Sequence, residues 1–308
     1  MEADGKANRD EVERPVQADR AEGARFGSSR AFETWLGVGV ARAARPLLPL
    51  LKGWLGAETV VVGELDRETR AAMWALYRAH YERVDEHQFY SDLDDKHHAI
   101  LLRDLADQSL QGFTTLHVDR LEVDGTPYVI VFSGDTIIAE DYQGQSALHR
   151  EFVRYIMRVA LTSAGARVYW YLISKGYKTY LLLSRNFNEY WPRHDAATPD
   201  AMGRLLGEVA RRRFGSSFDE ASGCIVFEPP GPKLKGHVAP VSESAMRSPD
   251  VRFFVEKNPG HADGDELCCL GRVDLQLGLS YAWRWGRRLV VRGVGGLSRL
   301  DKPSRTVR

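Results

Sequence analysis

The feature that most constrains this 308-residue chain is one long apolar run, residues 128–139 (YVIVFSGDTIIA), which is broken near its centre. A continuous apolar run of this length, bounded by turn residues, predicts a buried central strand of a sheet. The small and polar residues at 133–136 interrupt the run, and such breaks mark a bulge or a backbone that a ligand approaches closely. We therefore expect a sheet whose central strand is distorted around Asp135.

Short apolar runs and helical patterns alternate on both sides of this strand. Asp66 is expected to cap the helix that follows it, and Asp124-Gly125 supplies the residues that tolerate positive φ in a hairpin. The predicted elements, in chain order, are strand 58–63, helix 67–84, strand 98–103, strand 112–123, strand 128–139, helix 147–164, strand 168–173, helix 176–184, helix 200–213 and weaker strands 223–227 and 267–274. Pro- and Gly-rich loops are expected between the last two strands.

Composition limits the classes of protein to consider. Lys plus Arg and Asp plus Glu both number 42, so no excess of positive charge favours a nucleic-acid partner. Cys224, Cys268 and Cys269 suit neither a disulfide framework nor zinc-ligand spacing, so we expect them in the core. The sequence contains no long membrane-spanning run and no signal-peptide pattern, which predicts a cytoplasmic protein.

Four segments follow from the distribution of apolar residues. Residues 1–29 have almost no large apolar groups and are expected to be a disordered tail. Residues 30–56 form an amphipathic apolar segment, either packed on the domain or lying at a membrane interface. Residues 57–278 are expected to be the folded domain with its C-terminal extension. Residues 279–308 form a basic tail, in which eight Arg and Lys residues face only Asp301.

The stretch from Ile137 to Leu148 (IIAEDYQGQSAL) leads from the central strand into a helix. Together with the order of elements over residues 58–230, it resembles the GNAT acyltransferase superfamily. The phosphate-binding loop of that family reads Gln or Arg, two residues, Gly, one residue, then Gly or Ala. Here Gln143 takes the first position, while Ser146 and Leu148 stand where the family has small residues. The resemblance implies an α+β fold with a mixed, mostly antiparallel sheet flanked by helices.

The resemblance also implies a reaction, in which an acyl group moves from a coenzyme A or carrier-protein thioester to an amine. The thioester would be a co-substrate, with no permanently bound cofactor. Asp135 would deprotonate the amine, although it could instead only cap the bulge. Tyr180 would protonate the departing thiolate, with Tyr177 and Tyr190 as neighbours able to do the same. The residues implied to bind the donor's phosphates are Ile137, Ile138, Gln143, Gly144, Gln145, Ser146 and Ala147.

Residues 89–98 (FYSDLDDKHH) lie where the family shapes its acceptor pocket, but a run of this kind is more typical of a solvated loop. The adjacent His97 and His98 would point to opposite faces of a strand, so we predict no metal site. No Gly-x-Ser-x-Gly pattern occurs, which argues against a serine hydrolase.

Aromatic clusters at 169–171 and 190–191, the basic tail and the tryptophans of segment 30–56 favour a lipid-handling enzyme. The predicted acceptor is then a sphingoid base or another lipophilic amine, the acyl group is long, and the protein associates peripherally with the inner face of the membrane. Within the superfamily this is similar in type to bacterial ceramide synthases. The alternative is a GNAT-like module that has lost catalysis and serves as a binding scaffold.

Overall fold

The structure is a computed structural model that describes residues 51–227, 233–234, 241–281 and 283. The chain divides into two units, Met1–Leu47 and Leu48–Arg308, and every described residue belongs to the second. The predicted tail 1–29, most of the apolar segment 30–56 and most of the basic tail 279–308 therefore lie outside the described residues.

Nine of the described strands form one sheet, in the order β1-β3-β4-β5-β6-β11-β9-β8, with β7 also pairing with β11. The pairing of β5 with β6 is parallel, and all the other pairings in this sheet are antiparallel. The mixed, mostly antiparallel α+β fold is thus confirmed. The strands are β1 (Leu55–Val61), β3 (His98–Asp104), β4 (Leu110–Val123), β5 (Thr126–Ile138), β6 (Arg167–Ser174), β7 (Tyr190–Trp191), β8 (Phe218–Asp219), β9 (Cys224–Ile225) and β11 (Glu266–Val273), and a separate pair joins β2 (Tyr81–Glu82) to β10 (Lys233–Leu234).

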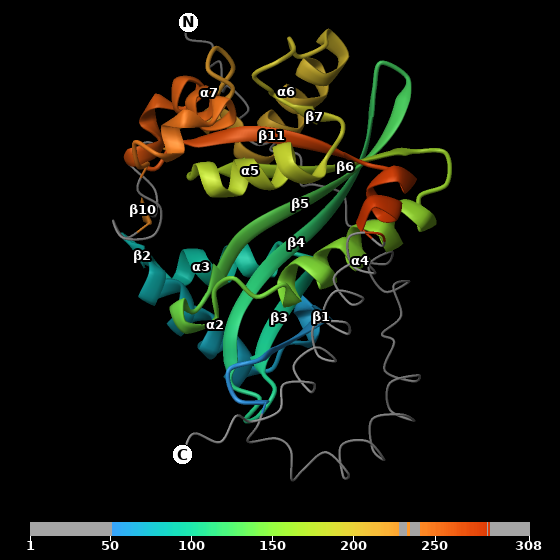
Figure 1. Cartoon of the computed structure of the whole chain (residues 1–308). Coiled ribbons are helices and arrows are strands. Elements are labelled where there is room, and N and C mark those ends of the chain that lie inside the picture. The colour runs from blue at the N-terminus through green and yellow to red at the C-terminus, as the bar shows by residue number, and fades with distance from the viewer. Residues whose placement is uncertain (1–50, 228–232, 235–240, 282, 284–308) are drawn as a thin grey trace, which may run out of the picture. The chain divides into compact units, whose positions relative to one another are not determined.

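Helices cover both faces of the sheet (Figure 1). Alternate strand residues divide between the faces, and α4, α5 and α7 pack on one face while α2, α3 and α6 pack on the other. The helices are α2 (Arg67–His80), α3 (Glu86–Asp94), α4 (Ala147–Thr162), α5 (Tyr177–Asn186), α6 (Asp200–Phe214) and α7 (Pro249–Lys257), with short 3₁₀ turns η4 (Val62–Glu64), η5 (Glu140–Tyr142), η6 (Gly215–Ser217), η7 (Ala245–Arg247) and η8 (Pro259–Ala262). Residues 275–281 are also helical. None of the described helices is long and apolar enough to cross a membrane.

Local sequence signals explain most of these boundaries. The carboxylate of Asp66 accepts a hydrogen bond from the backbone N–H of Thr69 and caps α2, as predicted. Asp124 and Gly125 both have positive φ, 51° and 71°, in the tight turn between β4 and β5. The three cysteines are buried, as expected.

Two predictions about loops were wrong. Residues 89–98 are not a loop, because α3 occupies most of this stretch and buries Phe89 and Leu93. Asp85 accepts a hydrogen bond from the N–H of Gln88 at 2.8 Å, which is a helix-capping signal that the acidic composition of this stretch obscured. The stretch between β9 and β11 likewise contains α7, whose first residue is Pro249.

Candidate active site

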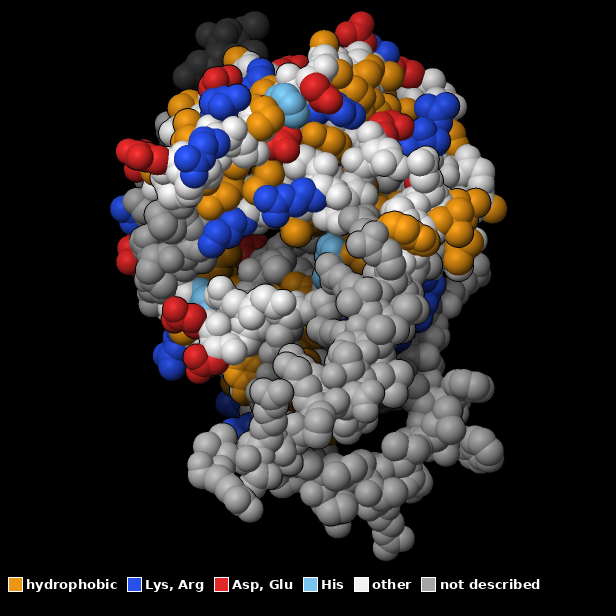
Figure 2. Space-filling model, in the orientation of Figure 1, with side chains coloured by type: hydrophobic (Ala, Val, Ile, Leu, Met, Phe, Trp, Pro, Cys, Tyr) orange, Lys and Arg blue, Asp and Glu red, His pale blue; other side chains and the backbone are white. Residues whose placement is uncertain are grey.

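The parallel pair at the centre of the sheet separates part-way along its length. β5 pairs with β6 from Tyr128↔Arg167 to Ser133↔Leu172, yet β5 continues to Ile138 with β4 alone as its partner among the described strands. Figure 1 shows β5 bending away from β6 beyond this point. Figure 2 shows the surface hollowed here, between α5 and α3, with Lys and Arg side chains on the α5 rim. The separation leaves strand-edge backbone groups of β5 available to a ligand.

The predicted distortion of β5 lies where the strands separate. Thr114 pairs with Thr136 and Leu116 pairs with Ser133, so Gly134 and Asp135 together oppose the single residue Thr115. This is a β-bulge. A Cβ atom on Gly134 would lie 2.5 Å from Oγ1 of Thr115 and 3.5 Å from Cε of Lys96, so the close packing at the bulge requires glycine.

Asp135 is half-buried, and its carboxylate makes no hydrogen bond or ion pair with any described residue. Many protein atoms surround the group although part of it reaches solvent, which fits the floor of a hollow. Burial raises the pKa of Asp135 to about 6, against an opposing effect of Lys175 and with a further increase from Glu266. A carboxylate with these properties is suited to accept a proton near neutral pH. The reading of Asp135 as a cap of the bulge lacks the hydrogen bond that a cap would make.

The surroundings of Asp135 come from segments that are distant in sequence. Lys175, directly after β6, forms an ion pair with Glu266 of β11 at 3.2 Å, and both side chains are mostly covered. The ammonium of Lys175 also lies 5.4 Å from the ring centroid of Tyr81, which stacks on Tyr77 at 4.8 Å. Burial, and then the charge of Asp135, raise the pKa values of both tyrosines well above their usual value. These residues were not predicted from the sequence, although Lys175 lies only two positions after the predicted strand 168–173.

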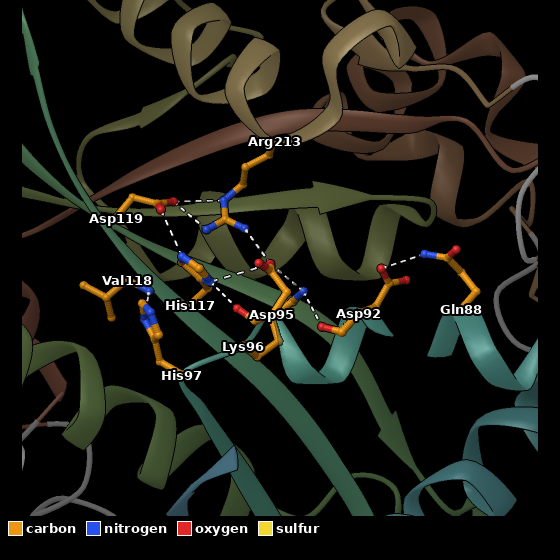
Figure 3. Close-up of polar contacts among 9 residues, drawn as sticks. All are labelled: Gln88, Asp92, Asp95, Lys96, His97, His117, Val118, Asp119 and Arg213. Atoms are coloured by element: carbon orange, nitrogen blue, oxygen red, sulfur yellow. Dashed lines mark hydrogen bonds and ion pairs between the residues drawn. The ribbon is translucent and has the colours of Figure 1, made fainter. Parts of the chain in front are cut away.

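Beside the bulge, a polar network joins β4 to the ends of α3 and α6 (Figure 3). His117 contacts the carbonyl of Asp95 through Nδ1 at 2.7 Å and the carboxylate of Asp119 through Nε2 at 3.0 Å. Arg213 donates to the same carboxylate and lies over the ring of Phe132. Burial would raise the pKa of Asp119, but the hydrogen bond from His117 and the charge of Arg213 outweigh it and hold the pKa at about 2.

This network connects the ends of α3 and α6 through β4. Its charged groups pair with one another, so we interpret it as structural. Lys96 belongs to it through hydrogen bonds from its ammonium to the carbonyl of Asp92, at 2.8 Å, and to Asp95. His97 stacks on His117, whereas His98 is buried on the opposite face of β3 against Tyr155. Within the described residues, no group of three or more His, Cys, Asp or Glu is placed to hold a metal ion.

The loop between β5 and α4 is held in place by side chains that the resemblance assigned to the donor. Gln145 accepts a hydrogen bond from the N–H of Leu55 at 2.9 Å and donates to the carbonyl of Gly53 at 2.7 Å. Gln143 is exposed and donates to the carbonyl of Ile138 at 3.4 Å. Gly144 has a φ of +81° and faces open space. These bonds fix the loop backbone against β1.

The other residues of the implied donor site are divided by burial. Ile137 and Ala147 are buried, and Ile138 is half-buried beside the core under α4. Ser146 is the N-cap of α4 but makes no side-chain capping bond, and its hydroxyl instead accepts from Arg150 at 3.3 Å. The first turn of α4 therefore presents backbone N–H groups and the positive end of the helix dipole.

The candidate tyrosines differ in their availability. Tyr180 is fully buried in α5, and its hydroxyl donates to the carbonyl of Pro192 at 3.0 Å. Tyr190 is also buried, with its hydroxyl 3.5 Å from the carboxylate of Asp250. Tyr177 begins α5, is half-buried, and its hydroxyl has no hydrogen bond to the described residues.

An open cavity of about 490 Å³ lies elsewhere, between α6 and the edge of β11. Gly203, Gly207 and Cys268 are among its lining residues, and neither Asp135 nor the loop before α4 reaches it. Its acidic lining residues, Asp200 and Glu220, are both exposed, and Glu220 pairs with Arg211. We therefore place the candidate active site at the separation of β5 and β6.

No family model matches this chain, and no curated protein matches it. Among solved structures, a probable N-acyltransferase from Enterococcus faecalis is 15% identical with a TM-score of 0.33, over 51% of this chain and 43% of that one. A GNAT family N-acetyltransferase from Escherichia coli, in complex with CoA, is 20% identical with a TM-score of 0.31, over 42% and 67%.

An aminoglycoside acetyltransferase from an uncultured soil metagenomic sample is 13% identical with a TM-score of 0.30, over 42% of this chain and 83% of that one. This chain spans less than half the length of the Enterococcus faecalis protein. All three TM-scores are below 0.5, so the function proposed for this chain rests on its own residues.

Proposed function

We propose that this protein transfers an acyl group from an acyl-CoA or acyl-carrier-protein thioester to an amine. The observation that carries the proposal is Asp135, a half-buried carboxylate that has no hydrogen bond or ion pair with the described residues and whose pKa is raised to about 6, placed where β5 separates from β6. An ammonium substrate must lose a proton before its nitrogen can attack a carbonyl. A base with a pKa slightly below neutral is charged at pH 7 and still strong enough to accept that proton.

In the proposed reaction the thioester lies along the free edge of β5 beyond Ser133. Asp135 takes a proton from the amine directly or through water, the nitrogen attacks the carbonyl, and backbone N–H groups stabilise the oxyanion of the tetrahedral intermediate. The C–N bond forms in this attack. The tetrahedral intermediate then collapses, the C–S bond breaks, the nitrogen loses its second proton, and the thiolate leaves and is protonated, so that one net proton is released through Asp135. The products are an amide and a free thiol.

The thiolate needs a proton, and α5 offers two candidates. The resemblance implied Tyr180 as the acid, but its hydroxyl already donates a hydrogen bond to the carbonyl of Pro192. Tyr177 is the first residue of α5, three positions after β6 ends, and its hydroxyl has no hydrogen bond to the described residues. We infer that Tyr177 is the better placed acid. Tyr177→Phe should lower turnover more than Tyr180→Phe.

The donor's phosphates are assigned to residues 143–147, together with the backbone of Ile137 and Ile138. The bonds of Gln145 to Leu55 and Gly53 hold the loop backbone, and the first turn of α4 has no side-chain capping bond from Ser146. A preformed set of backbone donors at a helix N-terminus suits a pyrophosphate.

A long acyl chain and a lipophilic acceptor, such as a sphingoid base, stay proposals that depend on membrane contact. Three exposed apolar residues support such contact: Leu275, Leu279 and Trp283 have exposed fractions of 68%, 71% and 64% and recur every four residues along one helical face. The opposite face packs on α4, with Gly278 against Met157. The sequence that follows is rich in Arg, which suits anionic headgroups.

Liposome flotation tests the contact. Leu275→Ser with Leu279→Ser should reduce binding to anionic vesicles, while Leu182→Ser, at an exposed site on α5, should leave it unchanged. Equal binding by both proteins would remove the support for a lipid acceptor.

The decisive test of the reaction is release of free thiol from acyl-CoA in the presence of a panel of polar and lipophilic amines, with the amide identified by mass spectrometry. An enzyme forms the amide and is stabilised thermally by coenzyme A. A binding module without catalysis would be stabilised but form no amide. A chain that shows neither effect is not an acyltransferase.

A further inference from the structure

Asn258, which follows α7, joins two segments that are distant in sequence. Its side chain is fully buried, and Nδ2 donates hydrogen bonds to the carbonyls of Ser174, at 3.3 Å, and Asp265, at 2.8 Å. Ser174 is the last residue of β6, and Asp265 directly precedes β11. One amide group therefore holds the end of one strand to the start of its neighbour.

The residue after each of these carbonyls is charged, and the two charges form a pair. Lys175 follows Ser174, Glu266 follows Asp265, and their side chains are 3.2 Å apart with only 15% and 10% of their surface exposed. A covered ion pair offsets its desolvation cost only when its geometry is well fixed. Asn258 supplies that fixation through the backbone on both sides.

The pair stands at the same edge of the sheet as Asp135. The parallel pairing ends at Ser133↔Leu172, Asp135 lies two residues beyond Ser133, and Lys175 lies three residues beyond Leu172. The charges that act on Asp135 come from Lys175 and Glu266 at the ends of β6 and β11 and from Lys96 and Asp92 in the α3 segment. The charge of Asp135 acts in turn on Tyr77 of α2 and Tyr81 of β2.

We propose that Asn258 is a positioning residue for acyl transfer, which sets the Lys175–Glu266 pair beside Asp135 and thereby fixes the charge that the base experiences. The inference rests on the proposed function, since it requires Asp135 to be the base. Without the amide, the two strand ends can move apart, and the ammonium of Lys175 no longer stabilises the carboxylate form of Asp135. The base then ionises at a higher pH.

The experiment is a double-mutant cycle on kcat/KM measured from pH 5 to pH 9. Asn258→Ser should lower kcat/KM at pH 7 by about tenfold and move the rising limb of the profile to higher pH. Lys175→Met should do the same by removing the ammonium itself. In the Lys175→Met protein, Asn258→Ser should have almost no further effect, because its action passes through Lys175.

A merely structural role predicts a different result, namely an equal loss in both backgrounds with no movement of the pH limb, and this would overturn the inference. Cys224→Ala is the matched control: the Cys224 thiol contacts the carbonyl of Lys257, next to Asn258, so the variant should lower stability but leave the pH limb in place. If Asn258→Ser does not fold, Asn258→Ala, which also removes the amide donor and adds no charge, replaces it in the cycle.

Asp135→Asn, measured beside this cycle, separates the proposed function from the role of Asn258. Full turnover by Asp135→Asn would overturn both the base and the role of Asn258. Loss of turnover in Asp135→Asn, with equal effects of Asn258→Ser in the two Lys175 backgrounds, would overturn only the role of Asn258.

Discussion

The bulge of β5 and the loop that follows it are only a few residues apart, yet they use polar groups in opposite ways. In the loop, Tyr142 donates to Asp104 at 2.7 Å and Gln145 binds β1 through both ends of its amide. In the bulge, the carboxylate of Asp135 has no partner among the described residues. Side-chain hydrogen bonds hold the loop, whereas the carboxylate at the bulge has none with the residues that the structure describes.

The pKa values of Asp104 and Asp135 show the same difference. Asp104 is buried, and hydrogen bonds from Tyr142, Ala106 and Gly53 hold its pKa below the usual value. Burial without such donors raises the pKa of Asp135 to about 6. Hydrogen bonds that stabilise an ionised carboxylate make it a structural anchor, whereas a carboxylate left without them can exchange a proton with a substrate. We therefore expect chemistry to depend on the bulge and donor affinity to depend on the loop.

The largest effect should come from Asp135→Asn, which keeps the size of the side chain but cannot accept the proton. Turnover should fall by about 10² to 10⁴-fold, the range typical of losing a general base, with little change in the dissociation constant of coenzyme A. In the unmodified protein, kcat/KM should rise with pH up to about 6 and level off above it, as Asp135 ionises. Near-normal turnover of the variant at every pH would return Asp135 to a structural role.

The second effect concerns stability and has opposite signs at the two acids. A raised pKa means that ionising Asp135 costs folding free energy as the pH rises from the unfolded value of 3.8 through about 6. At pH 8, Asp135→Asn should therefore increase the free energy of unfolding by about 1 to 2 kcal/mol, less than the full linkage value because the group is partly exposed. At pH 4 this gain should largely disappear.

Asp104→Asn should behave in the opposite way. The lowered pKa of Asp104 contributes stability above its unfolded value of 3.8 and loses it as the pH falls through the folded value, so the variant should be less stable at pH 7 and converge with the unmodified protein at low pH. Urea unfolding at pH 8, 6 and 4 measures both variants. The same sign for the two would mean that both carboxylates are anchors.

The sequence predicted the bulge and its carboxylate because their signal is local. Small and polar residues inside an apolar run indicate a break wherever that run is placed in a sheet, and Asp135 is the carboxylate within it. The parallel neighbour was also predictable, since residues 168–173 follow the helix that the loop begins. What the pattern cannot give is the register at which the two strands stop pairing.

The charged pair that acts on Asp135 escaped prediction because its two residues come together only through tertiary packing. Glu266 reaches Lys175 across 91 positions of sequence through the antiparallel pairing of β11 with β6. Nothing near either residue indicates the other. Gln145 illustrates a second limit of prediction from sequence. The resemblance implies that it binds the donor, whereas its side-chain amide accepts a hydrogen bond from Leu55, 90 positions away in sequence, and holds the loop.

The smallest effect should come from a substitution in the loop, Gly144→Val. A substitution at a matched glycine, Gly165→Val, is its control. Gly144 and Gly165 have φ values of +81° and +78°, and a Cβ atom at either position would meet open space. Valine at either site carries the strain of a left-handed backbone, about 1 to 2 kcal/mol, so Gly144→Val and Gly165→Val should lower stability about equally. Their effects on the donor should differ.

Gly144 lies in the loop that leads into α4, and Gly165 in the turn that follows this helix. Displacing the loop backbone should weaken coenzyme A binding about two- to thirtyfold, the range that helix-terminus interactions with an anion span, while the maximal turnover at saturating donor stays near normal. Gly165→Val should leave the dissociation constant unchanged. Titration calorimetry decides between the outcomes. Equal weakening by both variants would trace the effect to general strain. No weakening by Gly144→Val would place the phosphate site outside the loop. In that case the loop would not bind the donor, and the proposed division between donor binding in the loop and proton transfer at the bulge would be wrong.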